Sequence, residues 1–206
     1  MKVDWQTLIE KNPLLASLPE DLKVAAKQQP FAEGQTLFLR GTRPKVMLYV
    51  LDGELRLIRH TTGGGQVILQ RSRKGFVAEA SMESKTYHCD VVASEAGRLL
   101  TFPIPMFRRA LDDQPAFRRV WMSGLAVEVR RLRAQNERLH LNKAADRVRH
   151  YIESEGRDGI LTLLHSRKAW AVELGLSHEA LYRTLAKMEA DGFISVSGDT
   201  ISVNPT

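Results

Sequence analysis

Four polar residues near the C-terminal end of the chain, His178, Glu179, Tyr182 and Arg183, have the types and spacing needed to contact the edges of nucleic-acid bases. An arginine can donate two hydrogen bonds to a guanine, and a glutamate can accept one from the amino group of a cytosine. On a helix these positions project from the first turn and a half, which is the part that enters the major groove of DNA. Because Glu179 and Arg183 are four residues apart, an ordinary ion pair on a helix surface is an alternative, and both interpretations can hold together.

The residues around this set predict the pair of helices that would hold it. Residues 169–174 form a short helical segment with the small Ala171 facing inward. Gly175 permits the left-handed backbone of a tight turn between two helices, and Ser177 is a suitable N-cap for the second helix. The buried face of that helix is predicted from Leu181, Leu185 and Met188. This spacing is typical of a helix-turn-helix.

A small β-hairpin follows the second helix. Residues 193–196 and 200–203 are strand-forming segments on either side of Gly198-Asp199. The hairpin makes the predicted domain a winged helix-turn-helix. The residues expected to contact DNA are Lys168, Ser177, His178, Glu179, Tyr182 and Arg183.

A second group of ligating side chains is the segment Tyr87-His88-Cys89-Asp90. On a strand, Tyr87 and Cys89 share one face, and His88 and Asp90 share the other. Because His88 and Cys89 would diverge, the segment argues against a haem or metal site, and structural roles for both are the alternative. One cysteine in 206 residues also excludes an iron–sulfur cluster and a disulfide within the chain.

The histidines argue against a metal-dependent enzyme of the cupin type. Such a site gathers two or three histidines and a carboxylate on neighbouring strands. The six histidines are His60, His88, His140, His150, His165 and His178, of which two lie in the β-rich part of the chain. No two of them are spaced His-x-His. The sequence therefore predicts neither a metal site nor an enzyme.

The first half of the chain predicts a β-rich domain behind a helical opening at residues 4–28, which Pro13 and Pro19 break. Strand-forming segments alternate with turn signals, and this regular spacing favours a jelly-roll-like sandwich or barrel. The segments are 36–40, 46–51, 54–59, 66–70, 87–93 and 98–102. The Gly63–Gly65 run predicts a hairpin tip, since it lacks the Lys-Ser/Thr pair and the helix of a phosphate-binding loop.

Residues 105–139 predict a helical region with two sets of residues that recur every seven positions. The sets are Leu125, Leu132 and Leu139, and Trp121, Glu128 and Gln135. Such a stripe suits a helix that pairs with a copy of itself. The alternative is a helix that packs on its own β-rich domain, but the polar Glu128 and Gln135 favour a symmetric dimer seam.

The composition is that of a folded protein with an excess of positive charge. Hydrophobic residues make up 43% and charged residues 26%, which excludes wholesale disorder. No apolar run is long enough to cross a membrane or to act as a signal peptide, so we expect a cytoplasmic protein without a membrane partner. The net charge is +6, and residues 130–149 hold seven Lys/Arg against two acidic residues. Such runs are usually solvated faces, but this one leads into the helix-turn-helix and supports a nucleic-acid partner.

The order of these parts resembles the family of the catabolite activator protein and the fumarate–nitrate regulator, the Crp/Fnr family. The resemblance covers essentially the whole chain and includes Leu174–Glu179 followed by Arg183. The segment Asp52-Gly53-Glu54-Leu55 is similar to a hairpin turn of the family, and Asn142–Ile152 resembles its hinge and first DNA-domain helix. Where many relatives carry an arginine before the glutamate, this chain has His178.

The resemblance implies an α+β fold in three parts. Residues 1–104 would form a cyclic-nucleotide-binding-like β-roll that senses an effector, residues 105–141 a dimerisation helix region, and residues 142–206 the winged helix-turn-helix. It implies a homodimeric transcription regulator that binds a palindromic operator in double-stranded DNA and contacts RNA polymerase. A signal would repack the 121–139 helices and swing the DNA-binding domains about a hinge at residues 140–144.

The effector is the part that the resemblance leaves open. Cyclic-nucleotide-binding relatives hold the phosphate and ribose with a Gly-Glu pair and, later, an Arg-Ser/Thr pair. Here Glu79 is retained, but the other positions carry Ala78, Tyr87 and His88, and the loss of the arginine argues against cyclic AMP. The predicted effector-pocket residues are Ala78, Glu79, Tyr87, His88, Cys89 and, on the helix, Gln135 and Asn136. A ligand-sensing module that regulates a partner protein without DNA is the alternative function.

Overall fold

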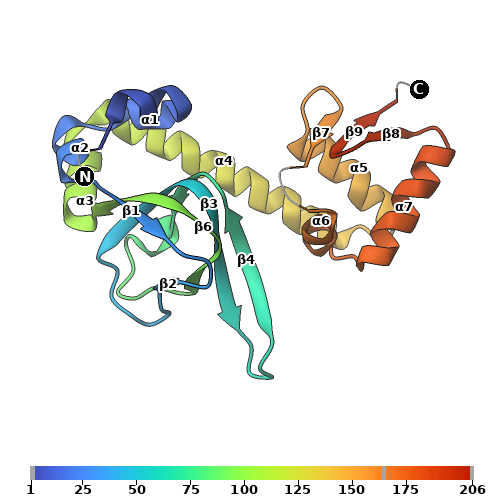
Figure 1. Cartoon of the computed structure of the whole chain (residues 1–206), viewed down its shortest axis with the longest axis horizontal. Helices are drawn as coiled ribbons and strands as arrows, with labels where there is room; N and C mark the ends of the chain where they lie inside the picture. The colour runs from blue at the N-terminus through green and yellow to red at the C-terminus, as the bar shows by residue number, and fades with distance from the viewer. Residues whose placement is uncertain (1–2, 164–165, 205–206) are drawn as a thin grey trace. The chain divides into compact units, whose positions relative to one another are not determined.

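The computed structural model describes residues 3–163 and 166–204, and the chain divides into two compact units, Met1–Trp121 and Met122–Thr206. The first unit contains an antiparallel β-roll with short helices, and the second contains helices and a small sheet (Figure 1). This is the predicted α+β class. No helix in the described ranges is long and apolar enough to cross a membrane.

The first unit opens with three short helical elements, as predicted. They are α1 (Trp5–Lys11), the 3₁₀-helix η1 (Pro13–Ser17) and α2 (Glu20–Ala25). Asp4 caps α1, because its carboxylate accepts a hydrogen bond from the Thr7 backbone N–H at 3.2 Å. The two prolines each begin a new element, since Pro13 starts η1 and Pro19 is the N-cap of α2.

The β-roll is a six-stranded antiparallel sheet. Its strands are β1 (Lys27–Phe31), β2 (Thr36–Phe38), β3 (Val46–His60), β4 (Gln66–Ser72), β5 (Gly75–Val77) and β6 (Asp90–Pro103), with the 3₁₀-helix η2 (Glu79–Ser81) after β5. The order is β1-β6-β3-β4, with β2 paired to β6 and β5 paired to β3. The β3–β4 hairpin extends from the roll and carries the predicted glycine tip (Figure 1).

Two strands are longer than the sequence predicts. The expected turn at Asp52-Gly53 is wrong, because β3 continues through it with shifts of register against β6. Gly53 has φ 79°, and a Cβ there would lie 2.5 Å from the Ala96 carbonyl oxygen. The backbones of β3 and β6 thus approach too closely here for any side chain, and only a glycine allows this contact within the sheet. The two predicted strands after residue 87 are likewise one strand, β6, which begins at Asp90.

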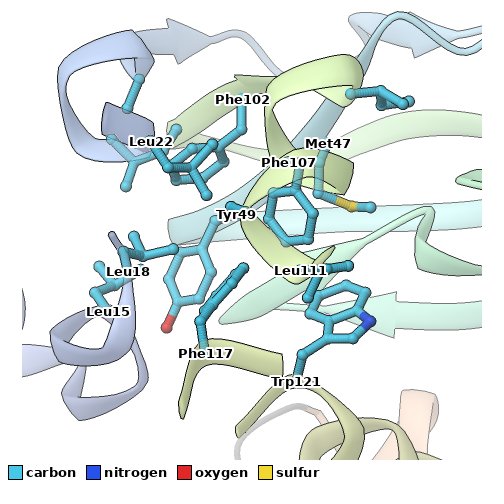
Figure 2. Packing of buried hydrophobic residues seen from close by; sticks show 14 of the residues in the cluster. Leu15, Leu18, Leu22, Met47, Tyr49, Phe102, Phe107, Leu111, Phe117 and Trp121 are labelled. Atoms are coloured by element: carbon cyan, nitrogen blue, oxygen red, sulfur yellow. The ribbon is translucent and has the colours of Figure 1, made fainter. Parts of the chain in front are cut away.

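The core of the first unit joins the helices to the roll. Figure 2 shows Phe107 between the sheet residues Tyr49 and Phe102 on one side and Trp121 on the other, with leucines of η1 and α2 nearby. Phe107 belongs to α3 (Ile104–Asp113), and Trp121 to α4 (Pro115–His140). The predicted helical region 105–139 is therefore two helices, since α3 ends at Asp113 and Pro115 begins α4.

The second unit holds the predicted helix-turn-helix and wing. Its elements after α4 are α5 (Ala144–Glu155), β7 (Ile160–Thr162), α6 (Arg167–Glu173), α7 (His178–Ala190), β8 (Ile194–Ser197) and β9 (Thr200–Val203). The strands form one sheet in the order β7-β9-β8, of which β7 was not expected. Trp170 of α6 and Leu181 of α7 lie fully buried in the core that these elements share.

Candidate nucleic-acid interface and effector region

The turn before α7 has the geometry that its sequence predicts. Gly175 has φ 64°, in the left-handed region. The Ser177 side chain caps α7 by accepting a hydrogen bond from the Ala180 backbone N–H at 3.1 Å. Leu181, Leu185 and Met188 are buried against the rest of the unit. The opposite face of α7 is thereby held outward.

The predicted base-contacting residues all lie on that outward face. His178, Glu179, Tyr182 and Arg183 are exposed, as are Lys168 on α6 and Ser177. Hydrogen bonds from its own backbone N–H and from Ser177 lower the pKa of the Glu179 carboxyl. Within the described ranges, Arg183 forms no hydrogen bond or ion pair, so the structure does not contain the Glu179–Arg183 pair weighed above. The Arg183 guanidinium is thus available to an external partner.

Arg167 is a residue of this face that the sequence analysis did not single out. Its Nη2 donates a hydrogen bond to the Gly198 carbonyl oxygen in the wing turn at 2.7 Å. Its guanidinium carbon lies 5.5 Å from the centre of the Tyr182 ring, which also contacts the His178 ring at 4.6 Å. Arg167 therefore joins α6, α7 and the wing. No spacing rule in the sequence distinguishes it from the neighbouring Lys168.

Only some of the basic side chains at residues 130–149 are available to an external partner. Arg131 pairs with Glu128 at 3.2 Å, and Arg138 is buried. Arg147 donates to the carbonyl oxygens of Leu141, Leu174 and Gly175. Arg131 is thus paired within α4, and Arg138 and Arg147 bond to other elements of the second unit, so the net charge of the segment overstates what it can offer to a phosphate backbone.

The leucines of the predicted dimer stripe on α4 are exposed, but the exposed residues beside them are not the second set predicted from the sequence. The exposed fractions are 37% for Leu125, 47% for Leu132 and 52% for Leu139, against 61% for Met122 and 45% for Val129. Asn136 continues the second set and is exposed as well. Met122, Val129 and Asn136 thus alternate with the leucines at spacings of three and four, as in a coiled-coil seam.

The companion set proposed from the sequence lies elsewhere. Trp121 is buried in the core of the first unit, where its ring meets Phe76 at 5.0 Å and Phe107 at 4.9 Å (Figure 2). Glu128 pairs with Arg131, and Gln135 is half-buried. The assignment of Trp121 to a dimer seam is therefore wrong, because its side chain belongs to the core of the first unit. A heptad count alone could not distinguish a core aromatic from a seam residue one position along.

The predicted effector segment of the first unit contains two buried side chains. Tyr87 stacks on Phe38 with ring centres 4.1 Å apart, and its hydroxyl donates to the Val46 carbonyl oxygen at 3.3 Å. Burial raises the pKa of Tyr87 and of the Cys89 thiol. Both side chains belong to the core that Ala78 also enters. A protonated, buried thiol has little reactivity toward metals or oxidants.

His88 is half-buried and lies in the segment before β6, so the strand predicted for residues 87–89 is wrong. Its Nδ1 and the Ser81 hydroxyl are hydrogen bonded at 2.8 Å. Arg59 of β3 donates to the His88 carbonyl oxygen at 3.1 Å, so a guanidinium reaches this segment from another strand. Burial has the largest effect on the pKa of the Cys89 thiol and raises it; the Arg59 charge lowers it, and the Asp90 and Glu79 charges raise it. Sequence reasoning missed Arg59, because only the fold brings it to the segment.

Ala78 occupies a glycine-like backbone position in this segment. Its φ is 70° and its ψ 21°, where an alanine is strained by about 1 kcal/mol. Gln135 and Asn136 lie in the second unit, on α4. Across residues 3–163 and 166–204, no group of three or more His, Cys, Asp and Glu side chains could hold a metal ion. His165, one of the histidines considered above, lies outside the described residues.

Comparison with known proteins agrees with this architecture. Residues 28–114 match the family model of the cyclic nucleotide-binding domain. FixK2 from Bradyrhizobium japonicum superposes with a TM-score of 0.65 at 19% identity, over 87% of this chain and 93% of that one. The chain has the fold of the Crp/Fnr regulators.

Two further solved structures share the Crp/Fnr fold over nearly the whole chain. The catabolite activator protein of Thermus thermophilus gives a TM-score of 0.51 at 20% identity, over 94% of both chains. The c-di-GMP responsive global regulator CLP of Xanthomonas campestris gives 0.57 at 21% identity, over 98% of this chain and 100% of that one. No curated protein matches the sequence. At these identities the likeness is one of fold.

Proposed function

We propose that the protein is a homodimeric, sequence-specific regulator of transcription that reads a two-fold symmetric DNA site with α7. The observation that carries the proposal is the outward face of α7, where the exposed Arg183 forms no hydrogen bond or ion pair with the described residues and stands beside Glu179 and His178. The Crp/Fnr fold supports it, since solved structures of this fold include the catabolite activator protein. The proposal is for a binding protein rather than an enzyme.

Each exposed side chain has a distinct role in this proposal. Arg183 donates both terminal nitrogens to a guanine, and Glu179 accepts from a cytosine amino group. Tyr182 offers its ring to a base or a sugar, and His178 contacts the outer end of each half-site. Arg167 and Lys168 neutralise phosphates, and Ser177 positions the helix through its cap. RNA polymerase is the proposed protein partner.

The proposed partner of the α4 stripe is a second copy of the same helix. Met122, Val129 and Asn136 alternate with Leu125, Leu132 and Leu139 on one exposed face. A single asparagine among apolar seam positions fixes the register and favours two strands. Because each copy brings one α7, the dimer would present two recognition helices to two half-sites about 34–36 Å apart.

The β-roll is the proposed sensor in the arrangement of residues 1–104, 105–141 and 142–206 given above. Its effector pocket would include Ala78, Glu79 and His88, while Tyr87 and Cys89 support it from the core. Tyr87 fills the position of the phosphate-binding arginine and is turned inward. We therefore propose that the effector is not cyclic AMP.

The experiment that tests the function is selection of bound fragments from genomic DNA, followed by sequencing. We expect one enriched palindrome, bound with an affinity that falls steeply with salt. Arg183→Ala should cost about 1–3 kcal/mol on that site. Arg157→Ala is the matched control, because Arg157 is an arginine of the same unit that is almost fully exposed and lies in the turn before β7. Equal losses in both variants, or no enriched site at low salt, would contradict the proposal.

A further inference from the structure

A buried arginine joins the C-terminal end of α4 to the next helix. The Arg138 side chain is only 3% exposed. Its Nη1 donates to the Ser154 hydroxyl at 2.6 Å, and its Nη2 to the Glu155 carboxylate at 3.3 Å. Its guanidinium carbon lies 4.5 Å from the centre of the Tyr151 ring. Ser154, Glu155 and Tyr151 all belong to α5, so one side chain of α4 is held by three side chains of its neighbour.

The contact continues from α5 into the helix-turn-helix. The Tyr151 hydroxyl donates to the Glu173 carboxylate at 2.8 Å, and Glu173 is the last residue of α6. The Tyr151 ring meets the Trp170 ring edge-on at 5.6 Å. Burial, followed by the nearby Glu173 charge, raises the pKa of Tyr151 well above its usual value, so the hydroxyl remains a donor. Arg138 is thus connected through Tyr151 to the first helix of the motif.

Two other ties cross the same junction. Arg147 of α5 donates to the Leu141 carbonyl oxygen at 2.7 Å and to the carbonyl oxygens of Leu174 and Gly175, where the turn after α6 begins. His150 Nε2 lies 3.2 Å from the Glu137 carboxylate of α4. The sequence resemblance implies a hinge at residues 140–144. Side-chain contacts join α5, which follows this segment, both to α4 and to the residues after α6.

We infer that Arg138 is a positioning residue for DNA recognition, which locks the helix-turn-helix onto the C-terminal part of α4. In this arrangement, side chains of α4 and α5 tie both ends of the segment 140–144 within the unit Met122–Thr206. In a dimer paired through α4, the lock would hold the two α7 helices at one separation, so the protein would measure half-site spacing as well as sequence. This last consequence rests on the proposed function.

A spacing series of duplexes tests the role. The probe is the palindrome that the wild-type protein selects, together with versions in which one or two base pairs are added or removed between the half-sites. We expect the wild type to lose about tenfold or more in affinity per altered base pair, because a rigid dimer cannot follow the shift. Arg138→Gln should bind the selected spacing about tenfold more weakly, and its preference among spacings should shrink to about threefold or less.

Three variants separate positioning from stability. Arg133→Gln removes an equal charge from an exposed position of the same helix and should keep the wild-type spacing preference. Arg138→Lys keeps the charge but not the planar fork, and should restore only part of the preference. Tyr151→Phe removes the bond to Glu173 and retains the ring, so it tests the connection in a protein that keeps its core. If Arg138→Gln lost affinity by the same factor at every spacing, or kept the wild-type preference, the inference would be wrong.

A measurement without DNA distinguishes this inference from the proposed function. Spin labels on cysteines placed at Arg133 of α4 and Lys187 of α7, diluted with unlabelled protein, report the distance between these helices within one protomer. Cys89 is buried and should not react with the label. We expect a narrow distance distribution that broadens in Arg138→Gln. If the wild-type distance distribution is narrow but no palindrome is selected from DNA, only the proposed function is refuted. If Arg138→Gln leaves the distance distribution unchanged, the proposed role of Arg138 is refuted.

Discussion

Acidification should weaken the first unit through one buried carboxylate, Glu54 of β3. Its side chain is 2% exposed, and three arginines surround it: Arg56 at 2.9 Å, Arg71 at 3.0 Å and Arg73 at 3.1 Å. The Ser94 hydroxyl also donates to it at 2.5 Å. Burial alone would raise the pKa of this carboxyl, but the hydrogen bonds from Ser94 and Arg56 and the charges of Arg71 and Arg73 lower it from 4.5 to about 2.

The magnitude follows from the difference between the two pKa values. A carboxyl with a lowered pKa in the folded state stabilises the fold above its unfolded pKa, and this contribution disappears as the pH falls through the folded pKa. A shift from 4.5 to about 2 corresponds to about 3 kcal/mol at neutral pH. At about pH 3, between the two values, roughly two fifths of it remains. The stability that Glu54 contributes should thus fall by about 2 kcal/mol between about pH 7 and about pH 3.

Urea unfolding of the wild type and Glu54→Gln at several pH values measures this term. Tryptophan emission follows the first unit, which holds Trp5 and Trp121, and the transition displaced by the substitution is the one to analyse. The difference in unfolding free energy between the two proteins should shrink by about 2 kcal/mol on acidification. Asp52→Asn is the matched control on the same strand, since its pair with Arg98 is exposed and is expected to contribute less than about 1 kcal/mol. A difference for Glu54→Gln that stays constant with pH would refute the reasoning.

Two further predictions concern the glycine contact and the dimer seam. Gly53→Ala should lower the unfolding free energy of the first unit by at least about 2 kcal/mol more than Gly64→Ala, because both have positive φ but only Gly53 faces backbone atoms closer than 3 Å; equal losses in urea titrations would contradict the close contact in β3. Leu132→Asp should weaken dimerisation about a hundredfold or more in sedimentation experiments, since two buried leucines are lost per dimer. Val127→Asp, on an exposed position of α4 outside the stripe, should leave the dimer intact, and a monomer in that control would count against the seam.

Local patterns predicted the second unit well because its determinants are close in the sequence. Gly175, the Ser177 cap and the spacing of the buried leucines are each local signals, and the structure confirms the turn, the cap and the buried face. The wing was predicted from two strand-forming segments around a glycine turn. The strand β7 is only three residues long, and its pairing with β9 depends on the folded unit.

The remaining features depend on contacts between distant residues. The continuity of β3 depends on Gly53 approaching Ala96 across the sheet, which no turn rule reveals. The position of Trp121 depends on Phe76 and Phe107, and the position of Arg59 on the pairing of β3 with β6. The basic residues at 130–149 show the same limit. A basic side chain can contact DNA only if it has no partner within the protein, and Arg138 and Arg147 both have such partners.

The base preferences selected by the wild type and by Arg183→Ala test the central claim most directly. Both proteins would select from one pool of random duplexes, with Arg157→Ala as the control, and the bound sequences would be compared position by position. The account predicts a symmetric site for the wild type, and a loss of preference at one base pair of each half-site for Arg183→Ala alone. An asymmetric site, or identical preferences for the wild type and Arg183→Ala, would contradict recognition of DNA by this face of α7.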